Sequence, residues 1–352
     1  MSRFQIMDVT LRDGSYQINF QFSNADVRRI GGELDKLGIP FIEIGHGQGI
    51  GASEAGQGRA LHTDEEYLAE AKRSIRQAKV GMFCIPGIAT LDQLERMCNQ
   101  GLDFVRVGTN VDQVEESRPF IELAKRHGLV VMANYMKSYA CTPEEFAGQV
   151  LKSQDYGADY VYVVDSAGSM LPETLQRYYE AIRKKSDIAL GYHGHDNLGM
   201  AVANSIYAAE LGFELVDASL QGLGRSAGNV VLERFVAVAQ KLGYYQEIDI
   251  KKLLWLGYEY VAHFTDGHAI SPIDTICGVA GFHSSYLPVI HRYSGIYDVD
   301  PLALIEMYAK EDQLNMDEER LARIAQQLPR NQQNDSLLNM SRFLINEQKP
   351  RG

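Results

Sequence analysis

Cysteine is scarce in this chain, and its few positions are not arranged to bind a metal. The 352 residues include four cysteines, Cys84, Cys98, Cys141 and Cys277. No two of them have the Cys-x-x-Cys spacing of a thiolate zinc site, and their density is far below that of disulfide-stapled secreted domains. The sequence therefore predicts free thiols in a reducing compartment, which favours a cytoplasmic protein.

Positive charge and long apolar runs are also lacking. Lys and Arg number 34 against 46 Asp and Glu, which gives a formal net charge of −12, and the basic residues form no block. This balance argues against nucleic acid or an anionic membrane surface as the main partner. No apolar run approaches the ~20 residues of a membrane-spanning helix. Residues 1–15 do not have the charged and apolar regions of a secretory signal.

A dinucleotide fingerprint is missing too, and this absence bears on the fold. Eight short apolar, β-branched runs alternate with amphipathic stretches, an order typical of a parallel sheet. The runs are 4–10, 41–45, 81–85, 104–108, 130–135, 160–164, 188–193 and 215–218. The first run is followed by TLRDGS, not by the Gly-x-Gly-x-x-Gly turn of an open Rossmann sheet. Eight such units predict an α/β fold of the (β/α)8, or TIM-barrel, type.

The alternation of strand and helix ends near residue 243. Helical patterns lie between the runs at 25–37, 64–78, 114–127, 143–156 and 172–184, and Thr63 and Thr142 are expected to cap two of them. Beyond the last run, helical patterns over 251–264, 301–308 and 316–327 follow one another without strands. We therefore predict a catalytic barrel over residues 1–247 and a smaller helical domain over residues 248–352 that completes the site.

The segment from Gly191 to Ser205 carries the main functional signal. His193 and His195 end an apolar run, and residues i and i+2 of a strand point to the same side. Asp13 follows the first predicted strand, so a closed barrel would bring its carboxylate to the same end. One carboxylate and two imidazoles with open positions suit Mn²⁺, Mg²⁺ or another divalent ion. The alternative for this segment is a pair of structural histidines.

Polar side chains also gather at the ends of other predicted strands. Arg12 lies beside Asp13 and could hold a carboxylate or a developing enolate charge. Glu43 and His46 follow the second run, and Ser166 follows the sixth. His46 could contact a substrate or order its own Gly-rich loop. Because a purely structural core would place apolar residues at these ends, their polarity predicts an active site there.

These motifs resemble those of the metal-dependent pyruvate aldolase and carboxyltransferase superfamily. This group is 3-hydroxy-3-methylglutaryl-CoA lyase-like (DRE-TIM) and includes isopropylmalate synthase. Within it, the chain is most similar to the 4-hydroxy-2-oxovalerate aldolases. The matching blocks are TLRDGS (10–15), IEIGHGQG (42–49), IPGIAT (85–90), VDSAGSM (164–170), HGHDNLGMAVANS (193–205), VDASLQGLGRSAGN (216–229) and GVAGFHSSYL (278–287).

The resemblance implies a role for each of these residues. The metal ligands would be Asp13, His193, His195 and, as in the lyase branch, Asn229. Pyruvate would bind the ion as its enolate, with Arg12 on the enolate oxygen and Ser166 near the carboxylate. Glu43 would position Arg12.

Two positions depart from the pattern of these aldolases. Tyr16 stands where they carry a catalytic His, and His283 stands where they carry a Tyr. We hypothesise that the acid/base pair is retained with exchanged positions. His283 would then move the proton and Tyr16 would hydrogen-bond the hydroxyl, because a His titrates near neutral pH. The alternative is that Tyr16 has changed the substrate or the reaction.

The sequence thus favours a divalent-metal-dependent (class II) aldolase. It would cleave or form a 4-hydroxy-2-oxoacid from pyruvate and an aldehyde through a metal-bound pyruvate enolate. The first alternative is an acyl-CoA-dependent Claisen condensation with a 2-oxoacid, as in isopropylmalate and homocitrate synthases. A metal-binding subunit without turnover is another. The CoA-ester lyase branch is less similar, because its mobile loop carries a Cys and residues 221–229 have none.

The resemblance also bears on partners. It implies a homo-oligomer, and some of these aldolases channel their aldehyde to an aldehyde dehydrogenase. Such aldolases share a Gly-Gly-Gln-Glu-Asp stretch near the C-terminus, whereas residues 328–335 here read LPRNQQND. The chain therefore lacks the expected contact motif for a dehydrogenase partner.

Overall fold

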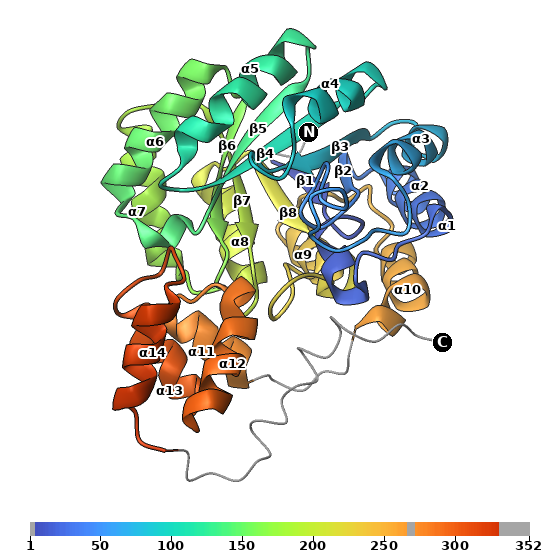
Figure 1. Cartoon of the computed structure of the whole chain (residues 1–352). Helices are drawn as coiled ribbons and strands as arrows, with labels where there is room; N and C mark the ends of the chain where they lie inside the picture. The colour runs from blue at the N-terminus through green and yellow to red at the C-terminus, as the bar shows by residue number, and fades with distance from the viewer. Residues whose placement is uncertain (1–3, 266–271, 331–352) are drawn as a thin grey trace.

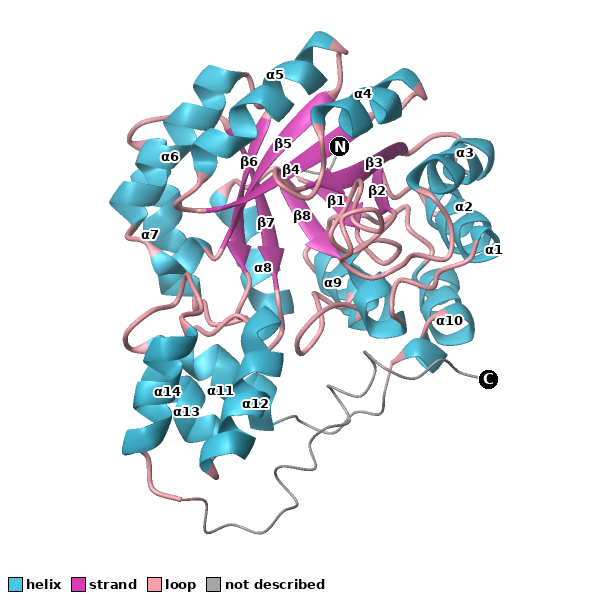
Figure 2. Ribbon diagram, in the orientation of Figure 1, coloured by secondary structure: helices cyan, strands magenta, loops and turns pink. Residues whose placement is uncertain are grey.

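Eight parallel strands form a closed barrel at the centre of the molecule (Figure 2). The computed structural model describes residues 4–265 and 272–330. The strands are β1 (Gln5–Asp8), β2 (Phe41–Ile44), β3 (Lys79–Cys84), β4 (Phe104–Asn110), β5 (Val130–Met136), β6 (Tyr160–Asp165), β7 (Ala189–Gly194) and β8 (Leu215–Ala218). Each strand pairs with the next, and β8 pairs with β1 to close the barrel. The predicted (β/α)8 fold is confirmed.

Helices surround the barrel on the outside (Figure 1). They are α1 (Asn24–Asp26), α2 (Gly32–Lys36), α3 (Asp64–Ser74), α4 (Leu91–Asn99), α5 (Arg118–Arg126), α6 (Pro143–Tyr156), α7 (Pro172–Arg183), α8 (Ala201–Leu211) and α9 (Leu232–Lys241). Thr63 and Thr142 form capping boxes at the starts of α3 and α6, as predicted. None of the helices in the described part of the chain is long and apolar enough to cross a membrane.

Three helical segments end or change type where the sequence pattern continues. Residues 25–37 were predicted as one helix, but a π-helical turn, η2 (Val27–Gly31), separates α1 from α2. The predicted helix 64–78 stops at Ser74, because Ile75 is extended and the next three N–H groups donate to the Asp35 carboxylate at 2.7 to 3.0 Å. Val114–Ser117 forms a 3₁₀ turn, η3, ahead of α5.

The barrel strands alternate between two environments. Outward side chains such as Val105 and Val107 pack with the helices in the main apolar core. Inward side chains fill the barrel, where a separate apolar cluster is formed by Met7, Val9, Phe41, Phe104, Met132, Tyr162, Val164 and Leu215. Further along the same inward faces, charged side chains replace apolar ones. The barrel therefore places its polar residues near the carboxyl ends of the strands, as in other barrels of this type.

The C-terminal part of the chain is helical. It contains α10 (Ile250–Tyr260), the 3₁₀ turn η6 (Ala262–Phe264), α11 (Pro272–Ala280), the 3₁₀ turn η7 (Ser284–Tyr286), α12 (Leu287–Tyr297), α13 (Pro301–Ala309) and α14 (Glu318–Gln327). Helices α11 to α14 form a bundle on the side of the barrel to which the arrowhead of β7 points (Figure 2). The bundle has its own apolar core, made of buried residues from Cys277 to Ala325 along the sequence.

Helix α10 packs with the barrel and not with the bundle. Leu253 and Leu256 belong to the apolar core of the barrel.

The division into domains at residues 247 and 248 stays a prediction. Most of the segment 328–335, on which the dehydrogenase partner depends, lies outside the described residues.

The contact between α10 and α9 yields the first testable prediction. A Cβ atom added to Gly257 would lie 1.8 Å from Oε1 of Glu233, whose buried carboxylate accepts the backbone N–H of Gln221 at 2.9 Å. We therefore expect Gly257→Ala to lower the free energy of unfolding by about 1–3 kcal/mol through overpacking. Gly148→Ala in α6 is the matched control, since its Cβ meets nothing within 4 Å. We expect that change to stabilise by up to about 1 kcal/mol. Urea unfolding midpoints that move together in both variants would contradict this packing.

Candidate metal centre and active site

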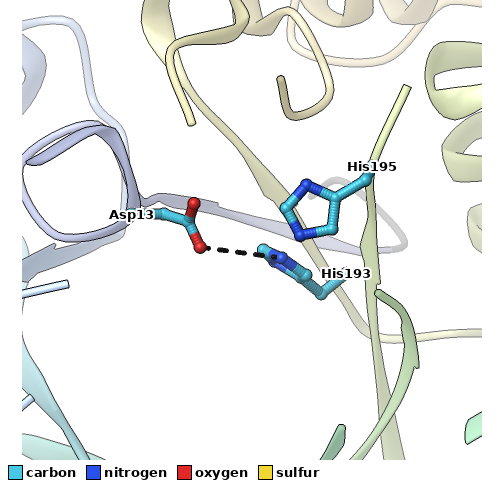
Figure 3. A group of neighbouring side chains, drawn as sticks. All are labelled: Asp13, His193 and His195. Carbon is cyan, nitrogen blue, oxygen red and sulfur yellow. Dashed lines mark ion pairs between the residues drawn. The ribbon is translucent and has the colours of Figure 1, made fainter. Parts of the chain in front are cut away.

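Three side chains predicted as metal ligands come together at the mouth of the barrel (Figure 3). His193 and His195 lie at the end of β7, and Asp13 opens the turn η1 (Asp13–Ile18) after β1. Each offers one ligand atom, and these atoms all lie within 4.8 Å of one another. Nε2 of His193 is 3.9 Å from Oδ2 of Asp13. All three residues are buried, so the group forms a compact site with nitrogen and oxygen donors.

Hydrogen bonds orient the two imidazole rings toward Asp13. Nδ1 of His193 lies 2.8 Å from Oδ2 of Asp217, and Nδ1 of His195 lies 3.2 Å from the carbonyl oxygen of Gly228. Because both partners accept hydrogen bonds, each Nδ1 carries the proton and each Nε2 keeps its lone pair for a metal ion. Burial, followed by the charge of His193, lowers the pKa of His195 to about 4. The ring of His195 is therefore neutral at pH 7, as a metal ligand must be.

Asn229, the fourth predicted ligand, lies beside His195. Its backbone forms a β-bridge with His195, and its side chain is buried. Nδ2 donates to the carbonyl oxygen of Leu223 at 3.2 Å, whereas Oδ1 has no hydrogen-bond partner among the described residues. A buried amide oxygen without a partner is costly. The four donors therefore fit a divalent ion that takes mixed oxygen and nitrogen ligands.

A chain of buried ion pairs surrounds the predicted ligands. Nη1 of Arg12 contacts Oδ2 of Asp13 at 2.6 Å, and Nε of Arg12 donates to Oε2 of Glu43 at 2.6 Å. On the other side of Glu43, Nε of Arg106 donates to Oε1 at 2.9 Å. Nη1 of Arg106 also donates to Asp217, which holds His193. The contacts thus run from Asp13 through Arg12, Glu43, Arg106 and Asp217 to His193, whose Nε2 lies 3.9 Å from Asp13. We call this closed set of residues the charge ring.

Sequence reasoning found Arg12 and Glu43 but missed Arg106 and Asp217. Both missed residues lie inside strands, on inward faces, and neither follows a strand end. The available signal was a single charge between apolar neighbours, in Val105-Arg106-Val107 and in Val216-Asp217-Ala218. In a buried strand such a charge requires a partner of opposite sign.

The charge ring controls ionisation at the site. Burial alone would raise the pKa of Asp13, but Arg12 and the two histidines lower it well below its ordinary value. Burial alone would lower the pKa of Arg12, but Glu43 and Asp13 raise it. Asp13 is therefore an anion and Arg12 a cation at any physiological pH. Only two of the five N–H donors of Arg12 take part in the contacts described above, which leaves donors for a substrate oxygen.

Ser166 and His46 lie at the mouth in different settings. Ser166 is buried after β6, and its Oγ accepts the backbone N–H of Lys137 at 3.0 Å. His46 stacks on Phe20 with ring centroids 3.7 Å apart, and its Nδ1 accepts the N–H of Gln48 at 3.0 Å. These contacts give His46 a structural place in its loop. A substrate contact for either residue stays a prediction.

Tyr16 and His283 are the two positions that depart from the aldolase pattern, and the charge of Arg225 acts to lower the pKa of each. Cζ of Arg225 is 4.3 Å from the centre of the Tyr16 ring. His283 is buried, and its pKa is lowered well below 6.5, first by burial and then by the charges of Arg225 and Lys137. Burial raises the pKa of Tyr16. The ring centre of His283 is 6.1 Å from that of Tyr286, and its role in the site stays a prediction.

Comparisons with known proteins agree with this geometry. The sequence model of the HMGL-like family matches residues 3–257. The chain is 43% identical over 248 residues to the oxaloacetate decarboxylase of Mycobacterium tuberculosis, covering 70% of this chain and 73% of the relative. It is 34% identical over 324 residues to 4-hydroxy-2-oxovalerate aldolase 2 of Nocardia farcinica, covering 92% and 94%. A 4-hydroxy-2-oxovalerate aldolase of Paraburkholderia xenovorans is 37% identical over 297 residues, covering 84% and 86%.

A solved structure shares the fold at lower sequence identity. The carboxyl transferase domain of Rhizobium etli pyruvate carboxylase aligns with a TM-score of 0.72 and 16% identity, covering 93% of this chain and 61% of the other. At this identity the likeness extends to the fold alone.

The hydrogen bond between Asp217 and His193 yields the second prediction. Asp217→Asn removes the negative charge that fixes the His193 tautomer and pairs with Arg106. We expect the affinity for Mn²⁺ to fall about 10- to 100-fold, the usual effect of losing a partner that orients a ligand. Titration followed by electron paramagnetic resonance measures this without any assay of turnover. Asp159→Asn is the control, because Asp159 pairs with Lys125 ahead of β6, away from this site. An Asp217→Asn variant with the affinity of the wild type would contradict the orienting role.

Proposed function

Because this chain belongs to the HMGL-like family, we propose that it is a divalent-metal-dependent aldolase. It would cleave a 4-hydroxy-2-oxoacid to pyruvate and an aldehyde, or join the two. The observation that carries the proposal is the convergence of Asp13, His193 and His195 beside Arg12 at the barrel mouth. Relatives named as 4-hydroxy-2-oxovalerate aldolases, similar over most of their length, support the same chemistry.

The site would work through a metal ion and a fixed guanidinium. A divalent ion held by Asp13, His193, His195 and Asn229 would supply Lewis-acid chemistry at the α-keto oxygen of the substrate. Arg12 cannot turn away from the mouth, since Glu43 and Asp13 hold two of its N–H groups. Its remaining donors would stabilise the charge that develops on the enolate oxygen of pyruvate. Ser166 would offer its hydroxyl to the carboxylate of the pyruvyl group.

The proton transfer depends on the tautomer of His283. Its Nδ1 lies 2.6 Å from Oγ of Ser285 and 3.2 Å from the backbone N of the same residue. When Nδ1–H donates to Oγ, Nε2 has a free lone pair and can accept the C4 hydroxyl proton of an aldol substrate. When the backbone N–H donates to Nδ1, Nε2 carries the proton and donates. Aldol cleavage uses the first form, in which Tyr16 would hydrogen-bond the hydroxyl.

Oxaloacetate decarboxylation is a second candidate, and a specific observation favours it. Tyr16 has a raised pKa, so it is a poor base at the position where aldolases carry a His. Loss of CO₂ from oxaloacetate, whose second carboxylate is on the carbon next to the keto group, leaves the same pyruvate enolate but requires no base, because no hydroxyl proton has to leave. The M. tuberculosis relative named oxaloacetate decarboxylase, at 43% identity, is consistent with this reaction.

A direct assay of the Mn²⁺-loaded protein tests the proposed function. We expect pyruvate to be released from a 4-hydroxy-2-oxoacid, and Asp13→Asn to reduce kcat/KM at least about 100-fold by removing an anionic ligand. Asp159→Asn again serves as the control. Release of free CoA from acetyl-CoA and a 2-oxoacid would instead identify the Claisen condensation. Turnover that survives chelation and the Asp13 change would contradict a metal mechanism.

The exchanged acid/base pair makes a further prediction. We expect His283→Ala to slow retro-aldol cleavage about 10²- to 10⁴-fold, the range for loss of a general base. We expect a smaller loss for Tyr16→Phe, because that change removes only a hydrogen bond. The oxaloacetate reaction should be less sensitive to His283→Ala than cleavage is. Full retro-aldol activity in His283→Ala would rule out the exchanged pair.

A further inference from the structure

Lys137 is a buried cation after β5 whose direct hydrogen-bond partners are uncharged. It follows β5, and the residue is only 4% exposed. Nζ donates to the hydroxyl of Tyr286 at 2.6 Å and to the carbonyl oxygen of Leu314 at 2.5 Å. Both partners are uncharged, and the third N–H of the ammonium is not used by either contact. Within residues 4–265 and 272–330, no carboxylate oxygen lies within ion-pair distance of Nζ.

Arg225 is a second cation of this kind. It lies in the Gly-rich loop after β8, and its backbone N–H donates to Oδ1 of Asp13 at 3.0 Å. Its half-buried guanidinium rests on the Tyr16 ring, 4.3 Å from the ring centre. In the described part of the chain, this guanidinium forms no ion pair either. Arg225 therefore contacts Asp13 through its backbone, while its guanidinium lies on Tyr16 without an ion-pair partner among these residues.

The two cations approach the Tyr16 and His283 positions from different elements. Arg225 rests on the Tyr16 ring, and Nζ of Lys137 donates to the hydroxyl of Tyr286, whose ring centre lies 6.1 Å from that of His283. The charges of Arg225 and Lys137 also lower the pKa of His283, after burial has done so.

Burial lowers the pKa of Lys137 to about 8, while the charges of Asp112 and Asp312 raise it, so most of the ammonium is charged at pH 7. A cation held away from water, as Lys137 is, is costly unless an anion pairs with it. Because the proposed function places Arg12 on the pyruvyl end, pyruvate itself would not use the charges of Lys137 and Arg225.

We propose that Lys137 and Arg225 bind a second carboxylate of the substrate, which is therefore a 2-oxo dicarboxylic acid. The inference rests on the proposed function, because it places the pyruvyl half of the substrate on Arg12 and the metal ligands. The rest of the substrate then extends past Tyr16 and His283 toward the two cations. A neutral aldehyde such as acetaldehyde would leave both charges unpaired.

Two kinds of substrate carry such a carboxylate, and they differ in where it goes. In a 4-hydroxy-2-oxo diacid, the C3–C4 bond breaks, the hydroxyl proton leaves to a base and the electron pair stays on C3. C3 then takes up a proton, and the carboxylate remains on the aldehyde product. In oxaloacetate, the C3–C4 bond breaks, the carboxylate leaves as CO₂ and C3 takes up a proton from water.

A matched pair of substrates tests the inference on the Mn²⁺-loaded protein. 4-Hydroxy-2-oxoglutarate and 4-hydroxy-2-oxopentanoate differ only by a carboxylate in place of a methyl group. We expect kcat/KM for the diacid to exceed that for the monoacid by about 10- to 100-fold, the range for hydrogen bonds to a charged group. The kcat/KM for oxaloacetate, measured under the same conditions, tells whether the site accepts a hydroxy diacid, oxaloacetate or both.

Two variants assign the preference to the proposed residues. We expect Lys137→Met and Arg225→Met each to reduce the ratio of diacid to monoacid kcat/KM about tenfold or more. Lys137→Arg should restore part of it, because it keeps the charge. Lys125→Met is the matched control, since Lys125 pairs with Asp159 ahead of β6, and it should leave the ratio unchanged.

The outcomes separate this inference from the proposed function. Exchange of the C3 protons of pyruvate for deuterium reports enolisation without any second carboxylate. Wild-type protein that exchanges these protons and shows no preference for the diacid overturns the carboxylate inference alone. Protein that neither exchanges them nor cleaves any substrate overturns the proposed function. If Lys137→Met lowers stability and Arg225→Met leaves the ratio unchanged, Lys137 only anchors the bundle and the inference fails.

Discussion

The charge ring inside the barrel is the constraint on which the rest of the site depends. Arg12 and Arg106 face three carboxylates, those of Asp13, Glu43 and Asp217, so the ring carries one excess negative charge when the histidines are neutral. A buried charge in excess is unfavourable unless a counter-charge lies next to it. Asp13, where the ring meets the imidazoles, is the end at which such a charge can bind. The ring therefore favours a cation at this position before any substrate is considered.

The barrel interior is shaped to hold these arginines. Gly81, Gly108 and Gly191 lie in β3, β4 and β7, and a Cβ at each would come within 2.4 Å of a neighbouring aromatic ring. The aromatic rings thus occupy the space that a Cβ atom would need at these three glycine positions. Cζ of Arg106 lies 5.6 Å from the Phe83 ring and 5.0 Å from the Tyr162 ring. Aromatic faces attract a guanidinium and also keep it rigid. Packing and electrostatics therefore fix the same side chains.

The sequence predicted the barrel and the metal group because both follow from short-range patterns. Strand ends were placed within about two residues, and the i, i+2 histidines could be recognised from spacing alone. Arg106 and Asp217 escaped because strand-end reasoning ignores positions within a strand. Lys137 escaped for a different reason: its partners, Tyr286 and Leu314, are more than 140 residues away along the chain. No periodicity relates such distant positions, so only the packing of the bundle on the barrel shows them together.

Different parts of the fold supply the residues at the two sides of the mouth. On the proposed function, the pyruvyl end would be held by residues of the barrel and its first loops, which the charge ring makes rigid. The distal end would face the loop after β8 and the bundle, which carries His283 and holds Lys137 through Tyr286 and Leu314. With a net charge of −12, the chain as a whole repels an anionic substrate, but screening limits that repulsion to about 8–10 Å at physiological salt. On the inference drawn above, an anionic substrate would therefore be selected inside the mouth, by Arg12, Arg225 and Lys137. A change of substrate would then require changes in the loop and the bundle, while the group at Asp13 would stay the same.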